Sequence, residues 1–287
     1  QELERLDRWQ IYEGFIKHVI ETKKLLLPES VRKVLEGSYE SLLISYQIFA
    51  SHVAFKAFQN NGVTLAIEEI VDEKEPEQQK EPKEVLSNWV NLKERMKEES
   101  QKEFAKRQAK LQTEAVDEKE KEEKKQVARR SVLKEEDYVQ MMDSKRSQFE
   151  SELPMKARGQ ETSQRYEYSH KSLFEYFMAK RLIMLKLKDS SAIIEEGMKL
   201  LLCRPVQSER EALQFWAEGW SKDAREKLTE PLFEIVKASG KDKTSETKLG
   251  KASANAATLL AKARVAFSGR DLSNVDISGA DLTNGIF

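Results

Sequence analysis

Apolar residues recur at helical spacing over the first sixty positions of the chain. They fall at Leu6, Trp9, Tyr12, Phe15, Ile16, Val19 and Ile20, and the same spacing returns between residues 31 and 53. Positions three and four apart share one face of a helix, so this pattern predicts amphipathic helices with one buried side. Asn60-Asn61-Gly62 predicts a helix stop, because Asn and Gly tolerate the left-handed conformation of a helix C-cap. The alternation of Val63, Leu65 and Ile67 then predicts one short strand.

The clearest helix start lies in residues 168–182, which have the sequence YSHKSLFEYFMAKRL. Ser172 and Glu175 have the spacing of a capping box, in which each side chain accepts a hydrogen bond from a free backbone N–H. The predicted helix then has a wide apolar stripe, formed by Phe174, Phe177, Met178, Leu182 and Leu185. His170 lies just ahead of this start, where free backbone N–H groups attract anions.

A highly charged segment separates these two apolar blocks. Between residues 91 and 130, 23 of 40 positions are charged, 13 basic and 10 acidic, which is typical of a solvated segment. The apolar spacing from Val85 to Met96 lasts only one or two turns, and residues 117–126 contain no apolar side chain, which argues against a sustained coiled coil. Residues 72–160 are therefore expected to form a charged insertion, helical or disordered. It is either a regulatory or partner-binding element or a tolerated surface insertion.

Three further helices are predicted after the histidine motif. The first ends at Pro205, and the second begins at a capping box formed by Ser208 and Glu211. The third begins at Thr229, with Pro231 in its first turn, and ends near Gly240. The second helix carries Trp216 and Trp220, which could form a base-stacking surface. Their helical spacing and the lack of neighbouring basic clusters favour packing between helices instead.

The last stretch divides into groups of five residues: VAFSG, RDLSN, VDISG, ADLTN and GIF. The central residues are Phe267, Leu272, Ile277, Leu282 and Phe287. A period of five fits neither a helix nor an alternating strand, so the backbone must return inward at every fifth residue. The stretch resembles pentapeptide repeats, which implies a four-sided, right-handed β-helix with these central residues in its interior. Arg270 departs from the small apolar residue that this family prefers at the second inward position.

The histidine motif also resembles a known family. HKSLFEYF, with Tyr168 two positions ahead of the histidine, is similar to the winged-helix segment of NACHT-type signalling NTPases, which belong to the STAND class. The opening LDRWQIYEGFIKHVI is similar to the segment that follows the nucleotide-binding domain in that family. The resemblance implies that His170 contacts the phosphates of bound ADP and so senses the nucleotide. The alternative is that His170 is a surface or capping histidine that binds no ligand, which the residues alone favour.

Charge, cysteine content, apolar stretches and short motifs indicate which partners and which location to expect. The formal net charge is −1, so no overall positive field favours nucleic acid as a partner. The single cysteine, Cys203, lies in an apolar run that predicts burial, and the absence of an internal disulfide fits a reducing, cytoplasmic location. No stretch reaches the roughly twenty apolar residues that cross a bilayer. The Gly-Lys pairs at 240–241 and 250–251 lack the glycine and hydroxyl positions of a phosphate-binding loop.

These observations together predict a mainly α chain. We expect a helical part of a winged-helix region at 1–71, the charged insertion at 72–160 and a helical region at 161–240. A linker and short helix at 241–264 and truncated pentapeptide repeats at 265–287 complete the expected organisation. The polar start at Gln1 and the end in the middle of a repeat lead us to expect that the intact protein continues at both ends.

Two functional hypotheses follow. In the first, the chain is the non-catalytic regulatory and repeat-bearing portion of a nucleotide-switched signalling NTPase. It would contact an upstream nucleotide-binding domain, where ADP or ATP with magnesium binds, and its repeats would bind protein partners. In the second, the chain is a protein-interaction scaffold without any link to nucleotide. Enzymatic activity of the chain itself is not expected, because His18, His52 and His170 have no catalytic or zinc-binding spacing.

Overall fold

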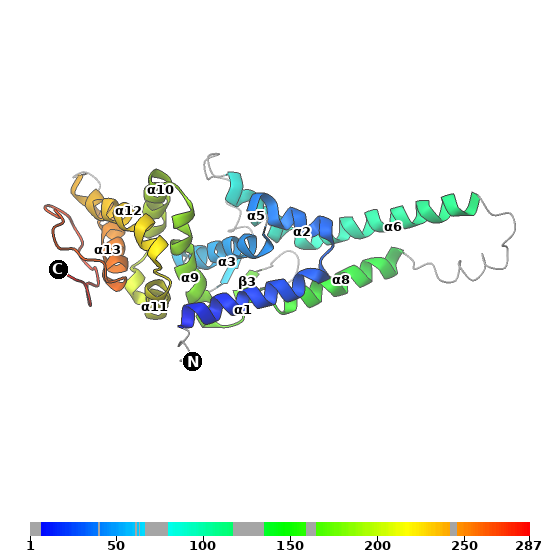
Figure 1. Cartoon of the computed structure of the whole chain (residues 1–287), viewed down its shortest axis with the longest axis horizontal. Coiled ribbons are helices and arrows are strands. Elements are labelled where there is room, and N and C mark those ends of the chain that lie inside the picture. The colour runs from blue at the N-terminus through cyan, green and yellow to red at the C-terminus, as the bar shows by residue number, and fades with distance from the viewer. Residues whose placement is uncertain are drawn as a thin grey trace. The chain divides into compact units, whose positions relative to one another are not determined.

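The computed structural model is mainly helical, which confirms the mainly α part of the predicted fold class (Figure 1). It describes residues 7–39, 41–60, 62, 64–66, 80–116, 135–158, 165–241 and 246–287. The helices are α1 (Arg8–Lys23), α2 (Glu29–Glu36), α3 (Leu42–Gln59), α5 (Lys80–Val90), α6 (Leu92–Val116), α8 (Glu135–Ser151), α9 (Lys171–Met184), α10 (Ser190–Leu201), α11 (Arg210–Glu218), α12 (Lys222–Lys241) and α13 (Glu246–Lys262). Across these described ranges, no helix combines the length and the apolar character needed to span a membrane.

The chain divides into two compact units, whose borders differ from the predicted segments. Unit 1 consists of residues 1–16, 47–72 and 154–287, and unit 2 of residues 17–46 and 73–153. Unit 2 thus combines the charged insertion with part of the first apolar block. The chain passes between the units within α1 and within α3, so continuous helical spacing in the sequence does not reveal the border.

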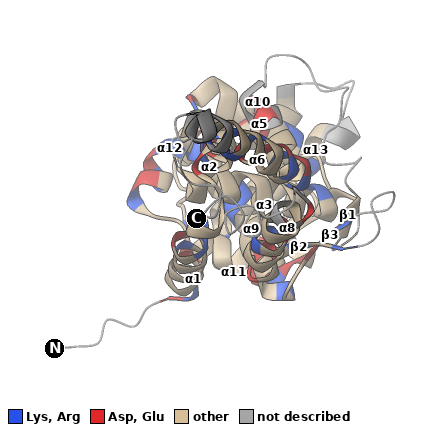
Figure 2. Ribbon diagram, turned by 90° about the vertical axis from the view of Figure 1, so that its right-hand side faces the viewer, with Lys and Arg blue, Asp and Glu red and all other residues tan. Residues whose placement is uncertain are grey.

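Unit 2 has an apolar core despite its many charges. The Trp89 ring stacks on Phe149, with ring centroids 6.3 Å apart, and meets Tyr46 edge-on at 5.2 Å. The indole Nε1 of Trp89 donates a hydrogen bond to Ser45 Oγ at 2.9 Å, so its polar atom is satisfied inside the core. Figure 2 shows Lys, Arg, Asp and Glu mixed along α2, α6 and α8. Of the residues expected in the insertion, α5, α6 and α8 are helical and residues 155–158 form a strand, whereas residues 72–79, 117–134 and 159–160 lie outside the described residues.

A small sheet in unit 1 leads into the histidine motif. Strands β1 (Thr64–Ala66), β3 (Arg165–Tyr168) and β2 (Met155–Arg158) form an antiparallel sheet in the order β1-β3-β2, and Leu65 pairs with Tyr166. The predicted strand is confirmed at Leu65, which is 1% exposed, while Val63 and Ile67 lie outside the described residues. The polypeptide passes from β3 through Ser169 and His170 directly into α9.

Helix α9 is buried along almost its full length. Its predicted apolar stripe is confirmed, because all five residues of the stripe are buried. Helix α9 packs against α11, and α10, α12 and α13 pack against one another behind it. Trp216 is 1% exposed and donates a hydrogen bond from Nε1 to the Leu259 carbonyl at 2.8 Å, so it belongs to the core, as predicted.

Two predicted helix starts are wrong. Helix α12 begins at Lys222 rather than at Thr229, and Pro231 lies inside it. The Thr229 hydroxyl donates to the Arg225 carbonyl one turn earlier, as Ser and Thr do within helices. Ser208 lies in a 3-10 turn (Val206–Ser208), and Glu209 is the N-cap of α11, without a side-chain capping bond. The sequence offers good capping residues at both places, but packing against neighbouring helices fixes the boundaries.

The chain after α13 makes four tight turns at intervals of five residues. The amide N–H groups of Arg270, Val275, Ala280 and Gly285 each donate to the carbonyl three residues earlier. Asp271, Asp276 and Asp281 each accept a hydrogen bond from the backbone N–H two residues on, which fixes the same corner each time. A parallel backbone bridge between Ala266 and Ile286 closes these twenty residues into one loop. The structure shows this loop and no β-helix within its described residues, whose only sheet is the three-stranded one.

The residues predicted for the interior of the repeat differ in their burial. Phe267 is buried, Leu272, Ile277 and Leu282 are half-buried, and Phe287 is 71% exposed. One face of the Phe287 ring stacks on Phe267 at 5.3 Å, and the rest of the ring is open. A single loop is packed against the rest of the protein on one side only. Most of the residues expected in its interior are therefore only half-buried.

Arg270 is accommodated by leaving the loop's interior. Its guanidinium makes two hydrogen bonds to Glu230 on α12, at 2.7 and 2.5 Å, and lies over the Phe233 ring at 4.3 Å. A planar guanidinium suits both contacts, because it pairs with carboxylates through two parallel bonds and stacks on aromatic faces. The residue that departs from the repeat pattern therefore fastens the loop to α12.

Candidate functional site

His170 is the N-cap of α9, and this corrects the predicted capping box. Its Nδ1 accepts a hydrogen bond from the Ser172 backbone N–H at 3.2 Å, so the histidine ring satisfies a donor at the helix start. Ser172 is the second residue of the helix, two positions beyond the cap. Glu175 is also inside the helix and pairs with Lys171 across one turn, with its carboxylate oxygen 3.3 Å from the ammonium nitrogen.

The hydrogen bonds of His170 define its tautomer. Because Nδ1 accepts from the Ser172 N–H, the neutral ring carries its proton on Nε2, which is then a donor. Within the described part of the chain, Nε2 has no hydrogen-bond partner, and the side chain is exposed. The ring therefore presents one N–H group to the outside at the positive end of a helix.

Tyr12 fixes this arrangement from α1. Its hydroxyl donates to Ser172 Oγ at 2.5 Å, and Ser172 Oγ lies 2.6 Å from His170 Nδ1. The three side chains form a short relay in which the serine hydroxyl accepts from Tyr12 and donates to the ring. This relay restricts rotation of the imidazole, so the direction of the Nε2–H bond is set before any ligand arrives.

A polar cluster beneath Tyr12 holds α1 on α9. Glu13 accepts a hydrogen bond from the Tyr176 hydroxyl at 2.7 Å and one from Gln47 at 3.1 Å, and it also pairs with Lys180. Burial raises the pKa of Tyr176 well above its ordinary value, and the nearby Glu13 charge adds to this. Burial lowers the pKa of Lys180, although Glu13 opposes that effect. The cluster is consequently a tightly packed support with its charges paired.

Aromatic packing adds to this support. The Tyr12 ring stacks on Tyr176 at 5.5 Å and meets Phe215 of α11 edge-on at 5.0 Å. The Trp9 ring lies 5.0 Å from Tyr176, with the Lys180 ammonium 5.3 Å from its centroid. Three helices therefore contribute to the position of His170.

An apolar cleft of about 400 Å³ opens beside the histidine ring. Its lining comes from α1 and the first turn of α9: Ile11, Tyr12, Phe15, His170, Ser172 and Leu173. Ile11 and Phe15 are 51% and 46% exposed, so the predicted burial of Phe15 on the apolar face of its helix is wrong. An exposed apolar rim around a single N–H donor suits contact with another folded surface.

The chemistry that this site allows is hydrogen bonding to an anion. Within the described ranges, no group of three or more His, Cys, Asp or Glu could hold a metal ion. Cys203 is buried as predicted, and burial raises the pKa of its thiol to about 12, so it is a poor nucleophile. The structure thus brings together His170 and Ser172. It adds Tyr12, which the sequence predicted only as a helix position, and Glu13, which no sequence pattern indicated.

Comparisons with known proteins give no identification: no protein-family model, no curated protein and no solved structure matches this chain.

Proposed function

We propose that this chain is the regulatory, repeat-bearing portion of a nucleotide-switched signalling NTPase of the NACHT type. In this proposal His170 donates from Nε2 to a phosphate of ADP, and the nucleotide with its magnesium is held by a domain upstream of these residues. The chain itself performs no hydrolysis and acts in the cytoplasm. The observation that carries the proposal is the oriented, exposed Nε2–H of His170 at the N-terminus of α9.

The geometry favours a phosphate as the partner of His170. The positive end of the α9 dipole attracts negative charge, and the neutral imidazole adds a donor without the cost of burying a second cation. The apolar rim with Ile11 and Phe15 supplies the contact surface for a neighbouring domain. Release of ADP would remove the histidine contact and allow that domain to separate from the rim.

The finer architecture belongs to the same proposal. The antiparallel sheet that leads into α9 supports a winged-helix region. The five-residue turns and the parallel bridge across twenty residues support a first coil of a right-handed pentapeptide β-helix. Helices α12 and α13 would cover the first side of this coil, while protein partners bind further repeats.

The test uses the protein expressed from its complete reading frame. His170→Ala removes both the helix cap and the Nε2 donor, whereas His170→Asn keeps a good capping side chain and removes the donor. A hydrogen bond to a charged group contributes about 1.5–3 kcal/mol, so we expect both variants to release ADP about ten- to hundred-fold faster than the wild type. Release is followed with a fluorescent ADP analogue.

His18→Ala is the matched control, because His18 is another exposed histidine on a helix and lies outside the site. It is expected to release ADP at the wild-type rate. Wild-type release from His170→Asn, with faster release only from His170→Ala, would assign the histidine a purely structural role. Unchanged release from both variants would remove the proposed sensor.

A second candidate function is a protein-interaction scaffold without nucleotide. The exposed apolar rim favours it, since that surface suits a protein contact whether or not a phosphate is present. Calorimetric titration of the full-length protein with ADP and magnesium separates the two candidates. Absence of binding would favour the scaffold, and micromolar or tighter binding would favour the nucleotide switch.

A further inference from the structure

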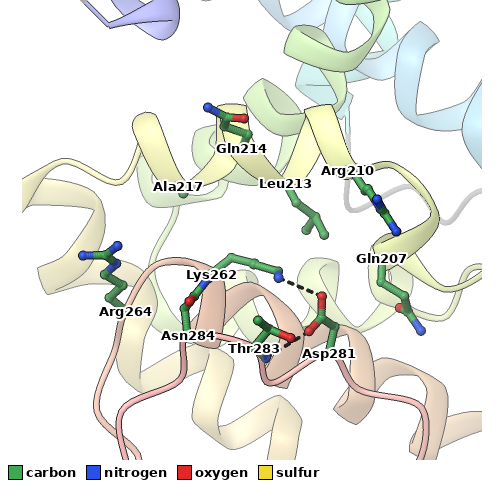
Figure 3. A pocket seen from close by; sticks show the side chains of 10 residues that line it. All are labelled: Gln207, Arg210, Leu213, Gln214, Ala217, Lys262, Arg264, Asp281, Thr283 and Asn284. Atoms are coloured by element: carbon green, nitrogen blue, oxygen red, sulfur yellow. Dashed lines mark hydrogen bonds and ion pairs between the residues drawn. The ribbon is translucent and has the colours of Figure 1, made fainter.

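A second and larger cavity lies between α11 and the five-residue turns. It has a volume of about 770 Å³, and Figure 3 shows α11 along one side and the end of α13 with the loop at 281–284 along the other. Its lining comprises Gln207, Arg210, Leu213, Gln214, Ala217, Lys262, Arg264, Asp281, Thr283 and Asn284. We call this cavity the α11 groove. It does not include His170, and the proposed nucleotide contact makes no use of it.

One ion pair neutralises the centre of the α11 groove. Lys262 Nζ lies 2.7 Å from Asp281 Oδ2, and the Thr283 backbone N–H donates to Asp281 Oδ1 at 2.9 Å. The hydrogen bond from Lys262 and those from Thr283 lower the pKa of Asp281 to about 2, so this carboxylate remains charged at neutral pH. The pair is self-contained and leaves no net charge at the middle of the groove.

Two arginines in the groove have no such partner. Arg210 and Arg264 are exposed, and neither guanidinium makes an ion pair or hydrogen bond to the described residues. The carboxylates adjacent to Arg210 in sequence bind other arginines, since Glu209 pairs with Arg204 and Glu211 with Arg8. The groove lining therefore has an excess of two positive charges that the chain does not neutralise.

The backbone at Arg264 supports a role for its side chain. Arg264 has a φ of 52° at the end of α13, a left-handed conformation that usually selects glycine at this position. A side chain larger than hydrogen is strained there, so folding alone would favour glycine. An arginine at this point places a cation at the groove at the expense of local stability.

The arrangement of the cations indicates an extended ligand. Figure 3 shows Arg264 at one end of the groove and Arg210 with Gln207 at the other. Arg210 and Ala217 are seven residues apart on α11, about 10 Å along the helix axis, which corresponds to about three residues of an extended peptide. Leu213 and Ala217 provide an apolar strip between the ends, and the side-chain oxygen of Gln214 can accept from a peptide N–H.

We propose that the α11 groove binds an acidic segment of a protein partner in extended conformation, with one carboxylate on Arg210 and a second on Arg264. Arginine suits this role because its guanidinium binds a carboxylate through two parallel hydrogen bonds. Two acidic residues three positions apart in an extended peptide match the roughly 10 Å of α11 between Arg210 and Ala217. The apolar strip accepts the small side chains between them.

The test measures binding of a fluorescent peptide, Glu-Ala-Ser-Glu, to the chain by anisotropy at low salt. Arg210→Ala and Arg264→Gly are each expected to weaken binding at least tenfold, and replacement of both glutamates of the peptide by glutamine is expected to do the same. Lys251→Ala, at an exposed lysine of α13 outside the groove, is the charge-matched control and should change binding less than twofold.

Arg264→Gly also separates binding from folding. Glycine relieves the left-handed backbone, so this variant should melt at the same temperature as the wild type or higher while losing the peptide. Equal binding of the glutamine peptide, or full binding by both arginine variants, would overturn the proposal. Competition by inorganic tripolyphosphate at a lower concentration than the unlabelled peptide would also overturn it, because the groove would then be a site for small anions.

Discussion

The buried ion pair between Arg181 and Glu196 joins the motif helix α9 to α10. The Arg181 Nη2 donates to Glu196 Oε1 at 2.5 Å, and Lys188 also pairs with the Glu196 carboxylate. The side chains of Arg181 and Glu196 are only 11% and 8% exposed. Replacement Glu196→Ala leaves a guanidinium inside unit 1 without its carboxylate, which makes this the most informative test of how α9 is held.

The expected loss is large because water cannot easily solvate the arginine that remains. Removing one partner of a buried pair costs about 3–5 kcal/mol, several times the value of an exposed pair. For a unit of this size, each kcal/mol lowers the melting temperature by about 2–4 °C, so Glu196→Ala should melt about 6–20 °C lower. The double variant Arg181→Met with Glu196→Leu should recover most of this loss, since no buried charge remains.

Urea denaturation followed by circular dichroism measures these free energies of unfolding. Glu195→Ala is the matched control, because Glu195 pairs with Lys199 on the solvent side of the same helix and should unfold like the wild type. A loss below about 1 kcal/mol for Glu196→Ala would show that water reaches Arg181. A double variant that is less stable than either single variant would refute the view that the stranded charge causes the loss.

Three further predictions concern other parts of unit 1. The Lys262 hydrogen bond depresses the pKa of Asp281 to about 2, so its stabilising contribution is complete above about pH 4 and is lost as the pH falls toward 2. Asp281→Asn should therefore flatten the fall in melting temperature over this pH interval. Gly219→Ala should lower the free energy of unfolding by about 1–3 kcal/mol in urea titrations, because the added Cβ would lie 2.9 Å from the Trp9 ring; unchanged stability would mean that the ring can move aside. Cys203 should react with iodoacetamide only after unfolding, since its thiol pKa is raised to about 12, and rapid labelling of the native chain would contradict its burial.

Local sequence patterns predicted those features that depend on residues only a few positions apart. The Asn60–Gly62 stop, the buried stripe of α9 and the five-residue turns depend on backbone preference and on side-chain period alone. His170 was predicted at a helix N-terminus for the same reason. Its role as the cap was predicted only as an alternative, because serine is a far commoner cap and the motif contains Ser172.

Contacts between distant segments could not be predicted in this way. Tyr12 meets Ser172 across 160 positions of the sequence, and nothing in either local pattern pairs them. The core of unit 2 depends likewise on Trp89 and Phe149, which stand on either side of a long charged stretch. Charge density predicted solvation there, whereas a few well-placed apolar residues are enough to pack α6 against α8.

The positions of the four tryptophans give each unit its own optical signal. Trp89 belongs to unit 2, whereas Trp9, Trp216 and Trp220 belong to unit 1. Trp216 and Trp220 have ring centroids 4.8 Å apart, close enough for their electronic transitions to couple and to produce a paired band in circular dichroism. A Trp89→Phe chain would emit only from unit 1, and the difference between its fluorescence and that of the wild type would report on unit 2, so the unfolding of each unit could be followed separately.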